Sequence, residues 1–253
     1  MEVTFLGTGT SQGIPIIGSN HPVCLSKNPK DKRLRVSVLV EWEGYNILID
    51  CGPDFRTQML SNNVQRLDAI LYTHEHNDHT AGLDDIRPFF FRQGDIPVFA
   101  HKRVLKSLRK RFDYIFETEN KYPGAPGVIE KEIENKPFHF EELEIIPVDF
   151  DHNRVQVFGF RMEDFAYLTD LKSIEEEEID KLRDLKVLVV NALRIEPHHS
   201  HLNLDEALEF IDKLKPERAY LTHISHLLGF HDEVQEQLPK NVFLAYDNLK
   251  ITI

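Results

Sequence analysis

The feature that most constrains the fold is a run of metal-binding side chains directly after a short apolar segment. The run Thr73–His79 has the sequence T-H-E-H-N-D-H, and the four residues before it are apolar. In an extended segment, residues i and i+2 point to the same side, so His74 and His76 can bind one ion. Asp78 and His79 follow where the chain turns, and they can reach a second ion. A buried strand is therefore expected to deliver a metal site to the edge of a sheet.

The rest of the chain predicts short strands interleaved with helices. Strands are expected at residues 3–6, 35–42, 45–49, 68–73, 96–100, 143–148, 155–161, 165–169, 186–190, 218–222 and 242–246. Helices are expected at residues 104–111, 174–182 and 203–214, the last with Asn203 as N-cap and Glu206 completing a capping box. Because hairpins occur among the strands, a mixed pair of sheets covered by helices fits better than a doubly wound sheet.

The length of 253 residues is compatible with one large domain or two small ones. Segment 113–137 has little hydrophobic pattern, contains the sequence P-G-A-P-G and is rich in acids. Strands resume after it, and their ligand-type residues point back to the same site. We therefore expect a single domain over 1–253, with an insertion or lid at about 113–137.

Composition narrows the class of protein. Lys and Arg total 30, Asp and Glu total 42, and the net charge is −12. This charge argues against a general nucleic-acid binder, because contacts to phosphates need a basic face. Cys24 and Cys51 are too few for a disulfide framework and fit a reducing compartment. The N-terminus lacks a basic and apolar leader, and no apolar run reaches 18 residues, so a cytoplasmic protein without a membrane span is expected.

Three further ligand-type side chains each come after an expected strand. They are His152, Asp170 and His223. Together with the first run they make five histidines and two aspartates, which is enough for two ions, with Asp170 as the natural bridge between them. Imidazole and carboxylate ligands suit Zn²⁺, Mn²⁺ or Fe²⁺. The sequence therefore predicts two divalent metal ions as cofactors.

The complete ligand pattern resembles that of the metallo-β-lactamase superfamily. The matching residues are His74, His76, Asp78, His79, His152, Asp170 and His223. The resemblance covers the chain from about residue 3 to about residue 250, and it implies a mixed α+β fold, a four-layer αββα sandwich with a two-metal site on one edge. It assigns His74, His76 and His152 to the first metal. It assigns Asp78, His79 and His223 to the second metal, with Asp170 shared, and it makes Asp50 the carboxylate that steadies the histidine loop.

Narrower motifs resemble the phosphodiesterase branch of that superfamily, whose pattern is that of PhnP-like phosphoribosyl cyclic phosphate phosphodiesterases. The motifs are Leu6–Ser11, Gly52–Arg56, Gly82–Pro88 and Pro197–His201. The resemblance implies that His201 acts as general acid at the leaving group, with His198 as a second candidate and Asp78 orienting the nucleophile. The expected reaction is hydrolysis of a small, cyclic phosphodiester by a hydroxide that bridges the two metals.

The same branch implies an additional structural zinc. His21, Cys24 and His226 stand at the matching spacing. A fourth strong ligand is missing, so a zinc site and an emptied site held by packing both stay open.

Two alternatives to a small-molecule phosphodiesterase stay open. A ribonuclease Z-like RNA phosphodiesterase shares the ligands, but it needs a basic arm where this chain has an acid-rich segment. A non-catalytic metal-binding protein on the same fold would keep the ligands without turnover.

The expected partners are a small phosphodiester and, as an open alternative, a second copy in a homodimer; no membrane and no nucleic acid beyond nucleotides are expected. The basic run Lys102–Arg111 predicts a solvated helix face.

Overall fold

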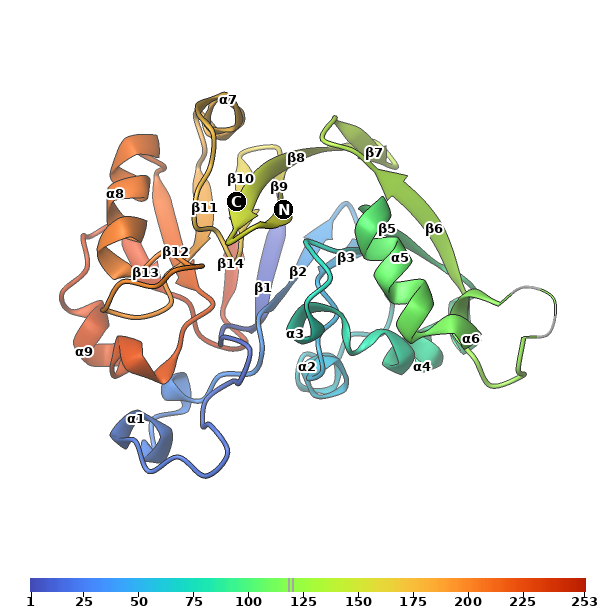
Figure 1. Cartoon of the computed structure of the whole chain (residues 1–253), viewed down its shortest axis with the longest axis horizontal. Helices are drawn as coiled ribbons and strands as arrows, with labels where there is room; N and C mark the ends of the chain where they lie inside the picture. Colours follow the sequence, from blue (N-terminus) through green and yellow to red (C-terminus); the bar gives the residue numbers. More distant parts are fainter. Residues whose placement is uncertain (118, 120) are drawn as a thin grey trace.

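Two seven-stranded sheets form the centre of the molecule in the computed structural model, which describes residues 1–117, 119 and 121–253 (Figure 1). The first sheet has the spatial order β14 (Lys250–Thr252), β1 (Glu2–Gly7), β2 (Ser37–Trp42), β3 (Tyr45–Ile49), β4 (Ala69–Leu71), β5 (Ile96–His101) and β6 (Val128–Ile133). The second has the order β13 (Val242–Leu244), β12 (Arg218–Thr222), β11 (Val187–Asn191), β10 (Phe165–Leu168), β9 (Val155–Met162), β8 (Leu143–His152) and β7 (Phe138–Phe140).

The two sheets have the same internal plan. Strands β14, β1, β2 and β3 pair antiparallel, whereas β3, β4, β5 and β6 pair parallel. In the second sheet β7, β8, β9 and β10 pair antiparallel, and β10, β11, β12 and β13 pair parallel. Parallel neighbours end at the same edge of a sheet. Residues that follow β3 and β4 therefore lie together, as do residues that follow β10 and β12.

Three hydrophobic cores separate four layers. One core lies between the sheets and contains Val38, Phe158 and Val189. A second lies between the first sheet and helices on its outer face. A third lies between the second sheet and its own helices. The expected αββα sandwich is therefore confirmed.

The helices are short, and most lie on the outer faces of the sheets (Figure 1). They are α1 (Pro22–Leu25), α2 (Phe55–Ser61), α3 (Asn77–Thr80), α4 (Arg87–Gln93), α5 (Lys102–Arg111), α6 (Asp113–Phe116), α7 (Glu176–Ile179), α8 (Leu204–Leu214) and α9 (His231–Gln235). Single 3₁₀ turns occur at Pro29–Asp31, Leu83–Ile86, Asp180–Leu182 and His226–Leu228. The predicted capping box of α8 is confirmed, because the Asn203 side chain accepts from the Glu206 amide and the Glu206 carboxylate accepts from the Asn203 amide.

Two segments differ from the expected elements. Strand β8 continues to His152, so this ligand candidate ends a strand and does not lie in the loop after it. A two-residue turn follows in which Asn153 and Arg154 both have positive φ, the geometry of a tight hairpin turn. Segment 113–137 contains α6 and β6, and β6 extends the first sheet by pairing in parallel with β5; Thr118 and Asn120 of this segment lie outside the described residues.

Across residues 1–117, 119 and 121–253, no helix has both the length and the apolar character needed to cross a lipid bilayer.

Close backbone packing beneath the histidine loop generates a stability prediction. A Cβ added at Gly52 would lie 2.1 Å from the Asp78 carbonyl oxygen, so Gly52→Ala must push the two loops apart. We expect this substitution to lower the free energy of unfolding by about 1–3 kcal/mol, as overpacking does elsewhere. Urea denaturation measures the change, with exposed Ser61→Ala on α2 as the control. An unchanged midpoint for Gly52→Ala would contradict the tight approach of the two loops.

Candidate metal centre

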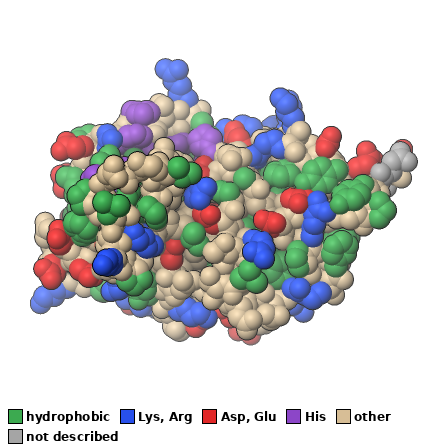
Figure 2. All heavy atoms as spheres, turned by 90° about the horizontal axis from the view of Figure 1, so that it is seen from below, with side chains coloured by type: hydrophobic (Ala, Val, Ile, Leu, Met, Phe, Trp, Pro, Cys, Tyr) green, Lys and Arg blue, Asp and Glu red, His purple; other side chains and the backbone are tan. Residues whose placement is uncertain are grey.

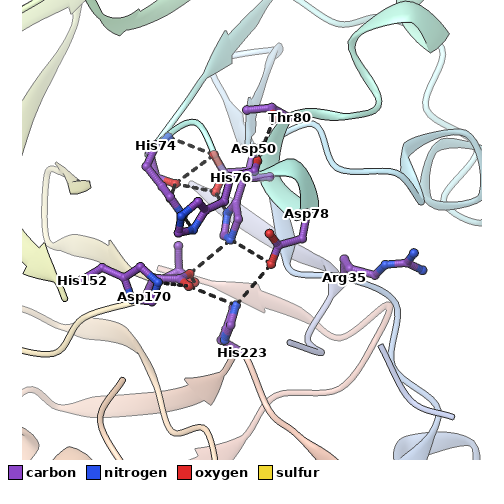
Figure 3. A network of polar contacts seen from close by, with 12 residues as sticks. Arg35, Asp50, His74, His76, Asp78, Thr80, His152, Asp170 and His223 are labelled. Atoms are coloured by element: carbon purple, nitrogen blue, oxygen red, sulfur yellow. Dashed lines mark hydrogen bonds and ion pairs between the residues drawn. The ribbon is translucent and has the colours of Figure 1, made fainter. Parts of the chain in front are cut away.

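The ends of five strands bring the predicted ligands to one edge of the sandwich (Figure 3). Asp50 follows β3, and the histidine loop 74–79 follows β4 in the first sheet. In the second sheet, His152 ends β8, Asp170 comes shortly after β10, and His223 directly follows β12. Because β8 runs in the same direction as β10 and β12, all three residues lie at the same end of that sheet. The face-to-face packing of the sheets then joins the two groups.

A left-handed backbone occurs at three of these strand ends. Asp50, Asp170 and His223 have φ values of 64°, 64° and 54°. Residues other than glycine adopt this conformation at a free-energy cost, and such residues concentrate at functional sites. Here the conformation ends each strand sharply and leaves the side chain at the edge of the sheet.

Asp170 is the centre of the cluster. Its carboxylate oxygens lie 3.2 Å from His79 Nε2, 3.3 Å from His223 Nε2 and 3.9 Å from His152 Nε2. The side chain is almost completely buried. This position between ligands of both sheets is the one expected for a carboxylate shared by two metals.

The remaining predicted ligands surround this carboxylate. Asp78 lies 3.5 Å from His79 Nε2 and 3.8 Å from His223 Nε2. His74 Nε2 lies 2.9 Å from His76 Nδ1. The rings of His76 and His152 are 5.3 Å apart. Within the described chain, three groups bring their ligand atoms within 4.8 Å of one another. These groups are His74 with His79 and Asp170, Asp78 with His79 and His223, and His152 with Asp170 and His201.

The hydrogen bonds of the histidines leave nitrogen atoms free for metal. His79 Nδ1 donates to Asp50 Oδ2 at 2.6 Å, and His152 Nδ1 donates to the Ser200 carbonyl at 2.6 Å. Both bonds direct Nε2 into the cluster, as is usual for metal-binding histidines. Nε2 of His79 and both ring nitrogens of His223 are buried without a hydrogen-bond partner. Buried polar atoms without partners are costly, so the donor set fits divalent metal ions well.

Asp50 connects the histidine loop to the first sheet. It is completely buried and accepts from the Thr73 amide at 2.9 Å and from the Thr73 hydroxyl at 2.8 Å, in addition to His79. Burial raises the pKa of Asp50, whereas His79 and Thr73 oppose that rise. The geometry therefore suits the supporting role that the sequence implied for Asp50.

The carboxylates control the protonation of the histidines in the metal-free protein. Burial by itself would lower the pKa of His79, but Asp170, Asp78 and Asp50 raise it well above its usual value. For Asp170, burial would raise the pKa, but His223 and His79 lower it well below the usual range. The same balance lowers the pKa of Asp78. In the metal-free site, the ionised Asp170 and Asp78 therefore favour a protonated His79.

His201 contacts the predicted ligand Asp170 directly, although the sequence implied that it acts as an acid and not as a ligand. Its Nε2 donates to Asp170 Oδ1 at 3.0 Å, and its Nδ1 lies 2.9 Å from Ser200 Oγ and 3.2 Å from His198 Nδ1. Burial lowers the pKa of His201 to about 4, against the attraction of Asp170. The ring is therefore neutral near pH 7 in the metal-free protein, which differs from the protonated acid expected from the sequence. His198 is half-buried and His199 is exposed. Figure 2 shows histidine side chains gathered on one part of the surface.

The residues of the candidate structural zinc are only partly assembled. The rings of His21 and His226 meet at 4.7 Å. Cys24 is buried among apolar residues that include Ile14 and Val23. Among the described residues, these three do not form a group whose ligand atoms all lie within 4.8 Å of one another. Of the two possibilities left open by the sequence, the packing of Cys24 agrees with the emptied site.

Sequence patterns missed the residues that orient the ligands. Ser200 fixes His152 through its backbone carbonyl, and Thr73 holds Asp50 through its amide and hydroxyl. Ser200 lies within the motif Pro197–His201, but a carbonyl contact depends on the backbone path and not on the side chain, so the motif gave no indication of this role. Thr73 begins the run Thr73–His79, and this position was the only available signal.

Comparison with known proteins decides the family. A model of the beta-lactamase superfamily domain matches residues 45–224. A protein of Porphyromonas gingivalis (strain ATCC BAA-308 / W83) named octanoyltransferase is 39% identical over 256 residues, which cover 100% of this chain and 52% of that protein. The chain belongs to the metallo-β-lactamase superfamily. It spans about half the length of that curated relative, so the relative's name describes a protein with a large part outside the match.

Two further similarities are to a protein described as a diphosphatase and to a protein named ribonuclease Z. A crystal structure described as a new diphosphatase from the PhnP family has a TM-score of 0.93 and 39% identity, covering 100% of this chain and 97% of that one. A ribonuclease Z of Methanocaldococcus jannaschii is 25% identical over 235 residues, which cover 87% of this chain and 62% of that protein. These similarities confirm the family that the sequence resembles.

Protonation of His79 generates a prediction for metal binding. Because its raised pKa keeps His79 protonated near pH 7, a metal must displace that proton. Affinity for Zn²⁺ is therefore expected to rise with pH, by about tenfold per unit while one proton is displaced. Isothermal titration calorimetry in buffers of different ionisation enthalpy measures the released proton. Binding without proton release between pH 6 and 8 would contradict the assignment of His79 as a protonated ligand.

Proposed function

We propose that this chain is a dinuclear-metal-dependent hydrolase that cleaves a small phosphodiester. The observation that carries the proposal is the convergence of the other six predicted ligands around the buried Asp170 carboxylate, where Nε2 of His79 and both ring nitrogens of His223 have no hydrogen-bond partner. The similarity to a PhnP-family diphosphatase along the whole chain supports chemistry at phosphorus. A site that only stored metal would not need His201, whose Nε2 lies 3.0 Å from the same carboxylate.

The ligand atoms divide between two metals as the family resemblance implies. His74, His76 and His152 would hold the first ion. Asp78, His79 and His223 would hold the second, with Asp170 between them. When bound, two such ions lower the pKa of water and offset negative charge on phosphoryl oxygens, and Zn²⁺, Mn²⁺ and Fe²⁺ all suit these ligands. The cluster is largely buried, which strengthens these electrostatic effects.

In this proposal His201 supplies the proton for the departing oxygen as an imidazolium, because a neutral imidazole that gave up its Nε2 proton would be left as imidazolate. The contact with the ionised Asp170 fixes the proton on Nε2, and Ser200 Oγ can donate to Nδ1. If Asp170 turns to the metals, Nε2–H is freed toward the same space. An anionic phosphate beside the ring would also raise its pKa from about 4. His198, through its contact with Nδ1, would hold the ring in place.

A small substrate fits this chain better than RNA does. The net charge is −12, and the exposed Glu132 and Glu134 lie in or beside the edge strand β6. A cyclic phosphodiester and a diphosphate both bring a phosphoryl group and an oxygen leaving group to such a site. The diphosphatase similarity favours testing the diphosphate alongside the cyclic ester. The ribonuclease Z similarity makes short RNA the second candidate substrate.

Turnover after metal reconstitution tests the proposed function directly. We expect the protein with two equivalents of Zn²⁺ or Mn²⁺ to hydrolyse bis(p-nitrophenyl) phosphate. A panel of phosphoribosyl cyclic phosphate, cyclic nucleotides, nucleoside diphosphates and short RNA then separates the substrate classes. Two tightly bound metals without turnover of any ester would favour the non-catalytic metal-binding alternative.

Replacement of His201 tests whether this residue acts as a general acid or as a metal ligand. We expect His201→Ala to retain both metals and to lower kcat by about 10²- to 10⁴-fold, the usual contribution of a general acid. The loss should be smaller for p-nitrophenyl esters, because p-nitrophenolate needs little protonation to leave. The exposed neighbour His199→Ala is the matched control. Loss of one metal from His201→Ala would instead make His201 a ligand, as its place beside His152 and Asp170 permits.

A further inference from the structure

Helix α5 carries a basic run whose side chains do not all face solvent, in contrast to the solvated face predicted from the sequence. Lys102, Lys106, Arg109 and Lys110 are exposed, whereas Arg103 and Arg111 are partly buried. These two arginines contact Glu75 and Asn77 of the histidine loop and Thr80, which directly follows it.

Arg103 joins the histidine loop to the second sheet. Its Nη1 lies 3.1 Å from Glu75 Oε1, and its Nη2 donates to the Gln156 carbonyl. Glu75 stands between His74 and His76 in the sequence. Gln156 lies in β9, next to the tight turn that follows His152. One guanidinium therefore connects the two segments that carry the proposed ligands of the first metal.

Arg111 contacts chiefly the other half of the same loop, and its Nη2 also donates to the Glu75 carbonyl at 3.4 Å. Its Nη2 donates to Thr80 Oγ1 at 2.6 Å, and its Nη1 donates to Asn77 Oδ1 at 3.2 Å. Thr80 Oγ1 in turn donates to the His76 carbonyl at 2.7 Å. Asn77 and Thr80 enclose Asp78 and His79, so Arg111 holds the helical turn α3 that carries two proposed ligands of the second metal.

We propose that Arg103 and Arg111 are positioning residues, with Arg103 acting chiefly on the ligands of the first metal and Arg111 chiefly on those of the second. Arg103 sets the separation of His74 and His76 from His152, and Arg111 fixes the direction of Asp78 and His79. This inference rests on the proposed metal centre. A guanidinium suits the task because its planar set of donors can bond two acceptors in fixed directions, which a lysine ammonium does not reproduce.

A third arginine of α5, Arg109, provides a matched control for Arg103 and Arg111. Arg109 belongs to the same basic run, but it pairs with Glu130 of β6 through Nη2 at 2.6 Å. No hydrogen bond or ion pair described for Arg109 involves the histidine loop. Replacement by methionine keeps an apolar stem and removes the guanidinium, so Arg103→Met, Arg111→Met and Arg109→Met form a comparable series.

The experiment measures metal affinity and stoichiometry independently of turnover. Each variant is stripped with chelator, titrated with Co²⁺ and followed by its visible spectrum, and Zn²⁺ affinity is obtained by competition. The first site has three histidines and the shared Asp170, whereas the second has two histidines, Asp78 and Asp170, so Co²⁺ gives a different visible band at each site. We expect Arg103→Met to weaken the first site and Arg111→Met the second, each by about 10- to 100-fold, as for other groups that orient metal ligands. Arg109→Met should bind both metals as the unchanged protein does.

The outcomes distinguish a failure of the positioning roles from a failure of the proposed function. Equal loss at both sites in each variant, or affinities equal to those of the unchanged protein, would overturn the inference. Thermal unfolding of the metal-free variants detects a general loss of stability, and Arg103→Lys distinguishes a need for charge from a need for two directed donors. If the unchanged protein binds no Co²⁺ pair, the proposed function fails. If it binds two ions and the arginine variants bind them equally well, only the positioning roles fail.

Discussion

The structure depends on one buried carboxylate that is shared by both halves of the molecule. Asp170 comes from the second sheet, yet His79 of the first sheet lies 3.2 Å from it, and His223 and His201 lie 3.3 Å and 3.0 Å away. An isolated carboxylate at this depth would be strongly destabilising. The surrounding imidazoles compensate for that cost and also form a set of metal ligands. Stability and chemistry at this edge of the sandwich therefore depend on the same contacts.

The matching plan of the two sheets explains why the ligands meet. In each sheet the antiparallel half ends in a parallel half, and the parallel strands direct their C-terminal ends to one edge. Side chains of both sheets fill the core between them, so that packing fixes the separation of the two edges. The ligands themselves contribute little apolar contact. Their positions are thus set by the three apolar cores and refined by Asp50, Ser200 and the arginines of α5.

Much of this arrangement could be predicted from residues that are close in sequence. The histidine run after an apolar strand, the capping box of α8 and most strands follow from short-range pattern, because burial and backbone geometry impose a local period. The family resemblance then supplied Asp50 and the distribution of ligands between two metals. Other features depend on distant partners. Strand β6 pairs with β5 without a clear hydrophobic alternation, and Arg103 differs from its exposed neighbours only in the residues it contacts.

The sequence by itself determined the chemical character of the site: seven imidazole and carboxylate groups placed at or just after the ends of strands. A side chain's ligand chemistry is a property of the residue, and a strand's end is marked by the local pattern. Only the tertiary structure decided that His201 donates to Asp170 and is neutral, that Cys24 is packed away from a three-ligand zinc group, and that two arginines contact the histidine loop. Protonation and contact depend on burial and on neighbours tens to hundreds of residues away, and these are defined only when the sheets pack together.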